Sequence, residues 1–248
     1  MCEQTTTTEK QTPQQPLKSA WLITNKTNLH VGDEGATSFG IIDKSIQRDA
    51  LTGIPCINSS SLKGAINEFC CNGIRVDGAV RKKIFGSDKI PSEDNNKEYS
   101  KGQTLFFDAH LLFLPRQKHE TLYELVYCEQ YLNCFTEKAA ALGITITSDQ
   151  IKNGLSNIRA VDTVAEFTQY CSDLELPIIA RNVLDNGESK NLWYEQYIPS
   201  EAIFGTLLIS NDITSGNVLE NALNNNELTI QIGANATIGY GYCKFKKL

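Results

Sequence analysis

Apolar and polar positions follow two different periods along this chain, and together they predict an α+β fold. Residues 19–25, "SAWLITN", form an apolar run that predicts a strand, which leads to His30 and a loop containing glycine. From about Ser60 to Cys71 the period becomes helical, because apolar side chains recur at i, i+3, i+4 and i+7. Those positions are Leu62, Ala65, Ile66 and Phe69. Ser60 or Ser61 is the expected N-cap of this helix.

The rest of the chain predicts further strands and helices in a repeated order. The expected elements are a strand at 104–115, a helix at 121–143 that ends at Gly143, a strand at 202–210, a helix at 215–225 and a last strand at 228–245. Residues 176–199 predict a projecting hairpin with its turn at Asn186-Gly187. The order strand–helix–strand, then strand–helix–strand, predicts a split βαβ, ferredoxin-like α+β domain with one long insertion.

Composition predicts a tail followed by one domain. The first residues, "MCEQTTTTEKQTPQQP", lack the apolar core of a secretory signal, so we expect a disordered tail at 1–18 and a single domain at 19–248. No apolar run approaches the ~18 residues of a membrane span. The eight cysteines form no Cys-x-x-Cys pair, so a zinc site is not indicated and reduced, buried thiols are expected. We therefore expect a cytoplasmic protein without a membrane partner.

The charge balance weakens the case for a nucleic-acid partner but does not remove it. The chain has 23 Lys and Arg against 29 Asp and Glu, for a net charge of −6, whereas nucleic-acid binding usually leaves a basic footprint. Positive charge is nevertheless clustered locally. Arg48 and Lys63 flank a run of serines, three basic residues lie at 81–83, and the chain ends with "KFKKL". A local patch of this kind is enough to bind a polyanion.

The loop at 31–58 and the serines that follow it carry the candidate chemistry. Long ordered loops are more often functional than idle. Serine hydroxyls and free amides at a helix N-terminus form an anion site, and Lys63 adds a point charge to it. The plain alternative is a serine cap with a solvated lysine. Asp43 lies in the same loop, where an aspartate is usually solvated or caps a turn.

Several sequence blocks, in order, give the chain a family resemblance. The blocks are "LHVG…GIIDKSIQRDALTGIPCINSSSLKGAI", "FDAHLLFLP", "LPIIARNVLDNGESKNLWYE" and "IQIGANATIGYGY". They resemble the backbone subunits of CRISPR effector complexes in the RAMP superfamily, and most of all the repeated subunit of the type III-B (Cmr) complex. The resemblance covers nearly everything after residue 19. The Ile-Gln-Arg after the aspartate favours type III-B over its type III-A counterpart.

The chain departs from the family pattern at four loop positions. Asn58 stands where glycine is usual, and Ser45 replaces a proline. Ala234 and Tyr240 change the glycine-rich loop near the C-terminus. None of these departures removes a charged group, so they bear on loop geometry more than on function.

The resemblance implies a guide-RNA-binding subunit that stacks in a filament and cuts target RNA. It places the family's catalytic aspartate at Asp43, which could hold Mg²⁺ or Mn²⁺ beside the scissile phosphate, with no organic cofactor. It also implies a thumb hairpin at about 174–198. RNA binding is expected at His30, Gln47, Arg48, Ser59, Ser60, Ser61, Lys63, Gly64, Arg181, Asn182, Lys190, Asn191, Gly239 and Gly241. The implied partners are guide crRNA, complementary target RNA, further copies of the chain, a large cyclase/polymerase-like subunit, a small helical subunit and end-capping RAMP subunits.

Structural roles compete with these assignments at several positions. His30 is equally well explained as a residue that holds the loop, and Gly239 and Gly241 also suit a tight turn. For Trp193 packing is favoured over stacking on RNA, and Asp108 is expected to be structural. At the level of the whole protein, the alternatives are a catalytically silent scaffold, the type III-A counterpart, a guide-processing RAMP ribonuclease, which the three histidines disfavour, and a ferredoxin-like metabolic enzyme, for which no dinucleotide fingerprint is present.

Overall fold

Four antiparallel strands at the centre of one sheet give the molecule its architecture. A computed structural model describes residues 15–33, 42–87, 100–225 and 227–248. The four strands lie in the order β11–β1–β9–β4. Their bounds are Leu17–Asn25 for β1, Ala109–Gln117 for β4, Ile203–Ser210 for β9 and Tyr242–Lys247 for β11. Helix α1 (Ser59–Glu68) separates the first two strands along the chain and α6 (Ile213–Leu223) the last two, which confirms the ferredoxin-like fold.

Shorter strands extend this sheet. On one side β10 (Ile230–Gln231) pairs with β11, and on the other β5 (Tyr123–Tyr127) pairs with β4 and β6 (Ile158–Ala160) lies parallel to β5. Two further short strands pair with strands inside the sheet: β2 (Cys56–Ile57) with β4, and β3 (Thr104–Phe106) with β9. The described sheet therefore ends in β10 at one edge and β6 at the other.

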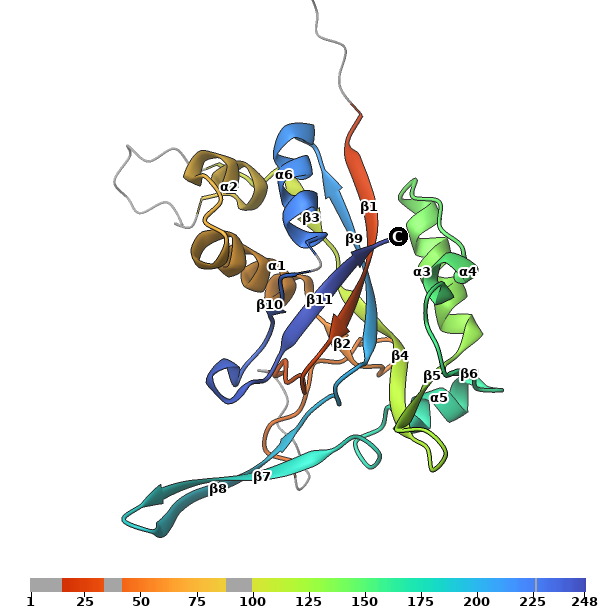
Figure 1. The fold of residues 1–248 in the computed structure, drawn as a ribbon, viewed down its shortest axis with the longest axis vertical. Helices are drawn as coiled ribbons and strands as arrows, with labels where there is room; N and C mark the ends of the chain where they lie inside the picture. The colour runs from red at the N-terminus through yellow and green to blue at the C-terminus, as the bar shows by residue number, and fades with distance from the viewer. Residues whose placement is uncertain (1–14, 34–41, 88–99, 226) are drawn as a thin grey trace, which may run out of the picture.

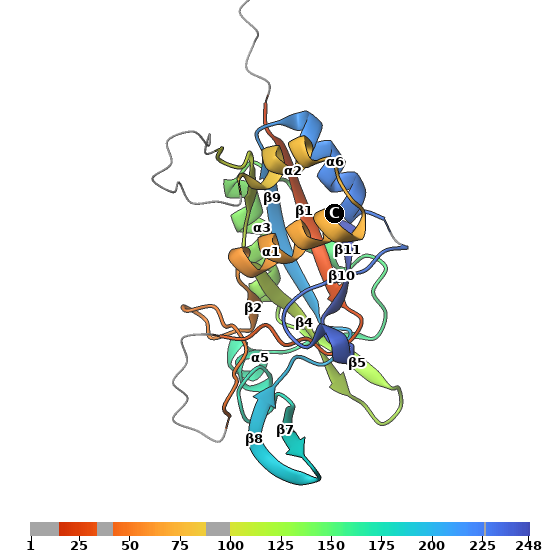
Figure 2. The same cartoon turned by 90° about the vertical axis from the view of Figure 1, so that its left-hand side faces the viewer.

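Helices cover both faces of the sheet, as Figures 1 and 2 show. On one face lie α1, α2 (Gly78–Phe85) and α6, and the π-helical turn η1 (Phe69–Gly73) continues α1. On the other face lie the inserted helices α3 (Glu129–Ala141) and α4 (Ser148–Lys152), with α5 (Val164–Tyr170) below them. None of the helices in the described ranges has the length and apolar character needed to cross a membrane.

The two faces of β1 feed two separate hydrophobic cores, because successive side chains of a strand point to opposite faces. Trp21 and Ile23 join the core that contains the buried residues of α1 and α6. Ala20 and Leu22 join a second core with α3. The sheet is thus buried on both sides, which explains why the centre of β1, from Ala20 to Ile23, is continuously apolar rather than alternating.

The predicted hairpin forms a separate two-stranded ribbon. It consists of β7 (Ile178–Asp185) and β8 (Glu188–Gln196), and it projects away from the sheet (Figure 1). Asn186 and Gly187 have φ values of 52° and 86°, as a tight hairpin turn requires. We call this ribbon the thumb.

Four expectations about elements need correction. The strand expected at 104–115 is two strands, β3 and β4, and the strand expected at 228–245 is divided into β10, a 3₁₀ turn at 236–238 and β11. Residues 121–143 were expected to form one helix, but 123–127 form strand β5 and only Glu129–Ala141 are helical. The apolar side chains of "LYELVY" fit both periods, and pairing with β4 decides in favour of the strand. Strand β1 begins at Leu17, two residues inside the expected tail, and residues 1–14 lie outside the described part of the chain.

Candidate nucleic-acid interface

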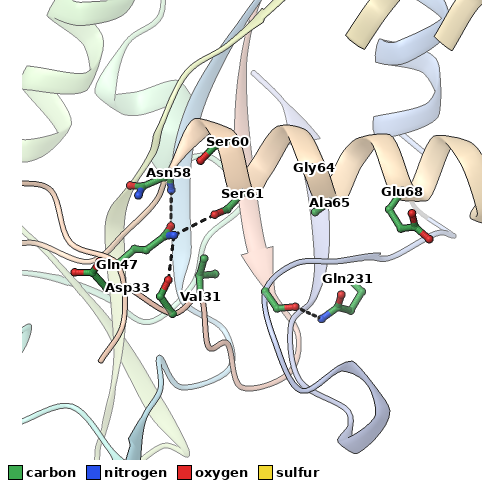
Figure 3. A pocket seen from close by; sticks show the side chains of 12 residues that line it. Val31, Asp33, Gln47, Asn58, Ser60, Ser61, Gly64, Ala65, Glu68 and Gln231 are labelled. Carbon is green, nitrogen blue, oxygen red and sulfur yellow. Dashed lines mark hydrogen bonds between the residues drawn. The ribbon is translucent and has the colours of Figure 1, made fainter. Parts of the chain in front are cut away.

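A polar groove of ≈ 640 Å³ runs beside α1 (Figure 3). One wall is the side of α1 from Ser60 to Glu68, and the other is made by segments at 31–33 and 231–233. Among the described residues that line it, the charged ones are Asp33 and Glu68, and none is a lysine or arginine. An RNA backbone lying here would therefore be held by hydroxyl, amide and backbone groups rather than by cations.

Gln47 joins the two walls of the groove. Its Nε2 donates to the carbonyl of Gly32 at 3.2 Å and to the hydroxyl of Ser61 at 3.0 Å, and its Oε1 accepts from the amide of Asn58 at 2.8 Å (Figure 3). The side-chain amide is thereby used within the protein. Gln47 therefore ties the segment at 31–33 to the start of α1, and its expected contact with RNA stays a prediction.

The serine turn is capped differently from the expectation. Helix α1 begins at Ser59, and no serine side chain caps it. Instead, the Asp108 carboxylate accepts a hydrogen bond of 2.6 Å from the Ser59 amide. The predicted serine cap is wrong, because Gln47 holds the Ser61 hydroxyl and Asp108 reaches the helix from the segment before β4. The structural role expected for Asp108 is confirmed.

This cap changes the electrostatics of the expected anion site. A carboxylate at a helix N-terminus is favourable for the helix, but it occupies the place of positive potential that a phosphate would use. Ser60 and Gly64 remain exposed on the groove wall. Lys63 lies on α1 and is not among the residues that line the groove, and its expected contact with phosphate stays a prediction.

Arg48 is also engaged inside the protein. Its guanidinium donates to the carbonyls of Gly53 and Cys171 at 2.8 and 2.7 Å and pairs with Asp173 at 2.8 Å. These bonds join the loop to the segment after α5, more than 120 residues away along the chain. Arg48 thus anchors the loop, and its expected contact with RNA stays a prediction.

His30 lies in the interior, as its structural alternative predicted. Its side chain and backbone are 3% exposed, and its Nδ1 is 2.6 Å from the carbonyl of Gln196. Its own carbonyl accepts from the amide of Ala234 at 2.9 Å, which ties it to the glycine-rich loop. In this structure the ring is therefore out of reach of RNA and supports the loops around the groove.

The two glycines expected to contact RNA have different surroundings. Gly239 has a φ of +83°, is exposed, and has open space where a Cβ would point. Gly241 has a φ of +80° and is buried, and a Cβ there would collide with the carbonyl oxygen of Ile232. The turn itself therefore requires Gly241, whereas Gly239 leaves room for close approach of a ligand.

Asp43 is exposed at the root of the thumb. Its carboxylate accepts a hydrogen bond of 2.7 Å from the amide of Tyr194, and its own amide donates to the Tyr194 carbonyl at 2.9 Å. Both contacts are with strand β8. The thumb thus fixes the Oδ2 oxygen of Asp43, and the Oδ1 oxygen takes no part in these two hydrogen bonds.

The predicted thumb residues do not share one face. Adjacent residues of a strand point to opposite sides, so Arg181 and Asn182 face apart. Asn182, Lys190 and Asn191 are exposed, and Lys190 pairs with Glu188 at 3.3 Å. Arg181 is directed to the root of the thumb, where its Nε is 3.2 Å from a carboxylate oxygen of Glu195.

Sequence reasoning missed a cluster of side chains around Glu195. Glu195 is 1% exposed, and one of its oxygens accepts a hydrogen bond from the side-chain amide of Asn235 in the glycine-rich loop. Trp193 packs here, as expected, with the Lys44 ammonium 4.7 Å from its ring centroid. An acidic residue two positions after a tryptophan was visible in "LWYE", but its partners come from distant segments.

The donor set at Asp43 fits a cation that is shared with RNA. Among the described residues no three His, Cys, Asp or Glu side chains gather in a group suited to a metal ion. Mg²⁺, however, is usually bound by one or two carboxylates together with waters and substrate phosphates. The Asp43 carboxylate is exposed, with Tyr194 occupying only one of its oxygens, and therefore suits such a shared site.

Comparison with known proteins gives consistent relatives. The model of the RAMP superfamily matches residues 22–244. The "CRISPR system Cmr endoribonuclease Cmr4" of Pyrococcus furiosus is 24% identical over an alignment 276 positions long, covering 88% of this chain and 91% of the relative. "CRISPR system Cms endoribonuclease Csm3" of Streptococcus thermophilus is 31% identical over 104 residues, covering 38% of this chain and 44% of that protein.

Solved structures show the same fold. A chain of the apo type III-B Cmr-beta complex superposes with a TM-score of 0.71 at 20% identity, covering 94% of this chain and 97% of the other. Oligomeric Cmr4 from Pyrococcus furiosus superposes with a TM-score of 0.68 at 21% identity, covering 93% and 98%. With a ferredoxin-like sheet, a projecting thumb and a family match that extends over most of its length, the chain belongs to the RAMP superfamily.

Proposed function

We propose that this chain is the repeated backbone subunit of a type III-B CRISPR effector complex, and that it cleaves guide-complementary RNA through Asp43. The family match, the full-length similarity to a Cmr endoribonuclease and the fold of Cmr subunits support the proposal. Guide pairing would then select the target, while the protein holds RNA by its backbone and shape. A cytoplasmic location is expected for such a subunit.

The observation that carries the catalytic part is the placement of Asp43. Its carboxylate is exposed and accepts one hydrogen bond from the Tyr194 amide, while the Asp43 amide donates to the Tyr194 carbonyl at the root of the thumb. A thumb that inserts into a guide–target duplex would place the disrupted base pair next to this residue. The predicted contacts at Ser60, Gly64, Gly239, Asn182, Lys190 and Asn191 all involve exposed positions and remain candidates for holding RNA.

The chemistry proposed at Asp43 is transesterification within the target strand. The 2′-oxygen of the nucleotide beside the scissile bond attacks phosphorus and loses its proton, and the bond from phosphorus to the 5′-oxygen breaks. The departing oxygen takes up a proton, leaving a 2′,3′-cyclic phosphate and a 5′-hydroxyl. A divalent cation, Mg²⁺ or Mn²⁺, held by Asp43 and RNA oxygens would stabilise the added negative charge. The role of Asp43 is to orient the cation and the RNA oxygens around the phosphate, because the Tyr194 amide holds its carboxylate in one position.

The test is Asp43→Asn in the complex assembled with a guide of known sequence. Asparagine keeps an oxygen to accept from the Tyr194 amide but removes the charge. We expect regularly spaced cuts in labelled complementary RNA with the wild type, and a loss of at least ~100-fold in the variant, typical for removal of a catalytic group, with target binding retained. Asp162→Asn, an exposed carboxylate beside α5, is the matched control and should cut normally.

Two results would contradict the proposal. Cleavage by Asp43→Asn at the wild-type rate would remove Asp43 from the chemistry. Tight target binding by a wild-type complex that makes no cuts would leave a catalytically silent scaffold.

A further inference from the structure

A buried charge at the root of the thumb has no role in the chemistry described so far. Glu195 is 1% exposed, and a carboxylate is costly to bury unless it is paired and hydrogen-bonded. Truncating one partner of such a pair leaves an uncompensated charge in the interior. We therefore take the buried Glu195 carboxylate as a sign that the chain segments it contacts are held in one arrangement.

The partners of Glu195 come from three segments. Arg181 of β7 lies 3.2 Å away, Asn235 of the glycine-rich loop donates to the same carboxylate, and the indole of Trp193 lies 3.5 Å from the other oxygen. The Arg181 guanidinium also lies over the ring of Tyr240, 4.9 Å from its centroid. Glu195 thus fastens both thumb strands to the loop that contains Gly239.

The segment that carries Asp43 is attached to the same part of β8. Four hydrogen bonds join residues 43–44 to residues 194–196: Asp43 N to Tyr194 O, Lys44 N to Tyr194 O, Gln196 N to Lys44 O, and Tyr194 N to the Asp43 carboxylate. The backbones of Lys44 and Glu195 form an isolated parallel β-bridge, and the Lys44 ammonium lies over the ring of Trp193. The position of Asp43 therefore depends on where the edge of β8 lies.

We propose that Glu195 is a positioning residue for Asp43. Its charge holds β8 against Arg181 and Asn235. It therefore fixes the edge of β8, to which the Asp43 carboxylate is hydrogen-bonded through the Tyr194 amide. The thumb and the catalytic carboxylate then move as one unit when RNA binds. This inference rests on the proposed function, because it assumes that Asp43 acts on the target strand.

The variant to measure is Glu195→Gln in the assembled complex. Glutamine keeps the size of the side chain but cannot neutralise Arg181, so the edge of β8 becomes less well fixed. We expect the single-turnover cleavage rate at saturating complex to fall by roughly 10-fold or more, since misplacement by about 1 Å can cost 10²-fold in rate. The dissociation constant for target RNA should stay within about 2-fold. Cuts at neighbouring phosphates should appear beside the regular ones.

Two further variants separate positioning from loss of structure. Glu188→Gln removes a carboxylate from the same strand, but one that is exposed and paired with Lys190, and it should cut at the wild-type rate and positions. Asn235→Gly removes the amide that reaches Glu195 while retaining a backbone suited to the φ of 66°. Asn235→Gly should show a smaller fall in the single-turnover cleavage rate, again with extra cuts at neighbouring phosphates. If Glu195→Gln does not assemble, Asn235→Gly tests the positioning role in its place.

The outcomes distinguish this proposal from the one on which it rests. Wild-type rates and cut positions in folded Glu195→Gln and Asn235→Gly would overturn the positioning role. A parallel loss of target affinity and cleavage would overturn it too, since Glu195 would then serve RNA binding. Undiminished cleavage by Asp43→Asn would instead refute the catalytic aspartate, whatever the Glu195 variants do.

Discussion

Arg48 and Gln47 belong to the sequence block that carries the family resemblance, yet the side chains of both form hydrogen bonds to other residues of the same chain. Arg48 reaches Cys171 and Asp173, and Gln47 reaches Ser61 and Asn58. Their residue types suggested contacts with RNA, because phosphates and base edges use the same donors. Partners more than 120 residues away cannot be read from local sequence, so the structural use of Arg48 could not be predicted.

His110 gives a prediction at the same scale. Burial, followed by the Lys138 ammonium 3.0 Å from its Nε2, lowers the pKa of His110 below its usual value. The unfolded chain, with a histidine pKa of ~6.5, therefore takes up a proton that the folded chain resists. The stability due to neutral His110 is complete above about pH 6.5 and is lost as the pH falls through the folded-state pKa.

Thermal unfolding between about pH 7.5 and pH 5 measures this effect. The melting temperature of His110→Gln should fall less steeply with decreasing pH than that of the wild type. His119→Gln, at an exposed position, should follow the wild type. Equal slopes for the wild type and His110→Gln would show that His110 is not responsible.

Among the elements, local sequence was a good guide where one period dominated. Strand β1, helix α1 and the Asn186-Gly187 turn were predicted and are confirmed. Residues 123–127 were misassigned because their apolar pattern fits both periods, and only pairing with β4 decides. The cap of α1 was missed for a similar reason, since Asp108 lies 49 residues after the amide it accepts from.

Removing that cap should weaken α1. Asp108→Ala leaves the Ser59 amide without its acceptor and should lower the free energy of unfolding by about 1 kcal/mol, as for other lost N-caps. Asp108→Asn retains an acceptor and should lose less. Urea unfolding of the isolated chain measures both values. A cost for Asn equal to that for Ala would argue that the charge, rather than the hydrogen bond, stabilises the helix.

Over the whole molecule, the order of strands and helices was enough to predict the ferredoxin-like arrangement, and the thumb was expected from the resemblance. What the sequence could not show is that inserted helices α3 and α4 build a second core on the opposite face of the sheet. The root of the thumb likewise combines β7, β8, the glycine-rich loop and residues 43–44, which only the folded chain brings together.

We expect the outer part of the thumb to be dispensable for folding, because its residues belong to neither hydrophobic core. Joining Asn182 to Leu192, which face each other across the ribbon, by a short Asn-Gly turn removes the tip but keeps Arg181 and Glu195. We expect the melting temperature to stay within about 3 °C of the wild type, since few buried groups are lost. Target cleavage in the assembled complex should fall, because the inserting part is missing. A large drop in melting temperature would show that the tip supports the fold.

The two ends of the main sheet limit how copies of this chain can join. Its edge strands, β10 and β6, contain only two and three residues, so they offer few free amides and carbonyls to a neighbouring strand. A continuous intermolecular sheet is therefore disfavoured. A stack of copies along RNA would be held by side-chain surfaces, thumbs and the RNA itself, and its spacing would be set by the nucleic acid rather than by strand pairing between sheet edges.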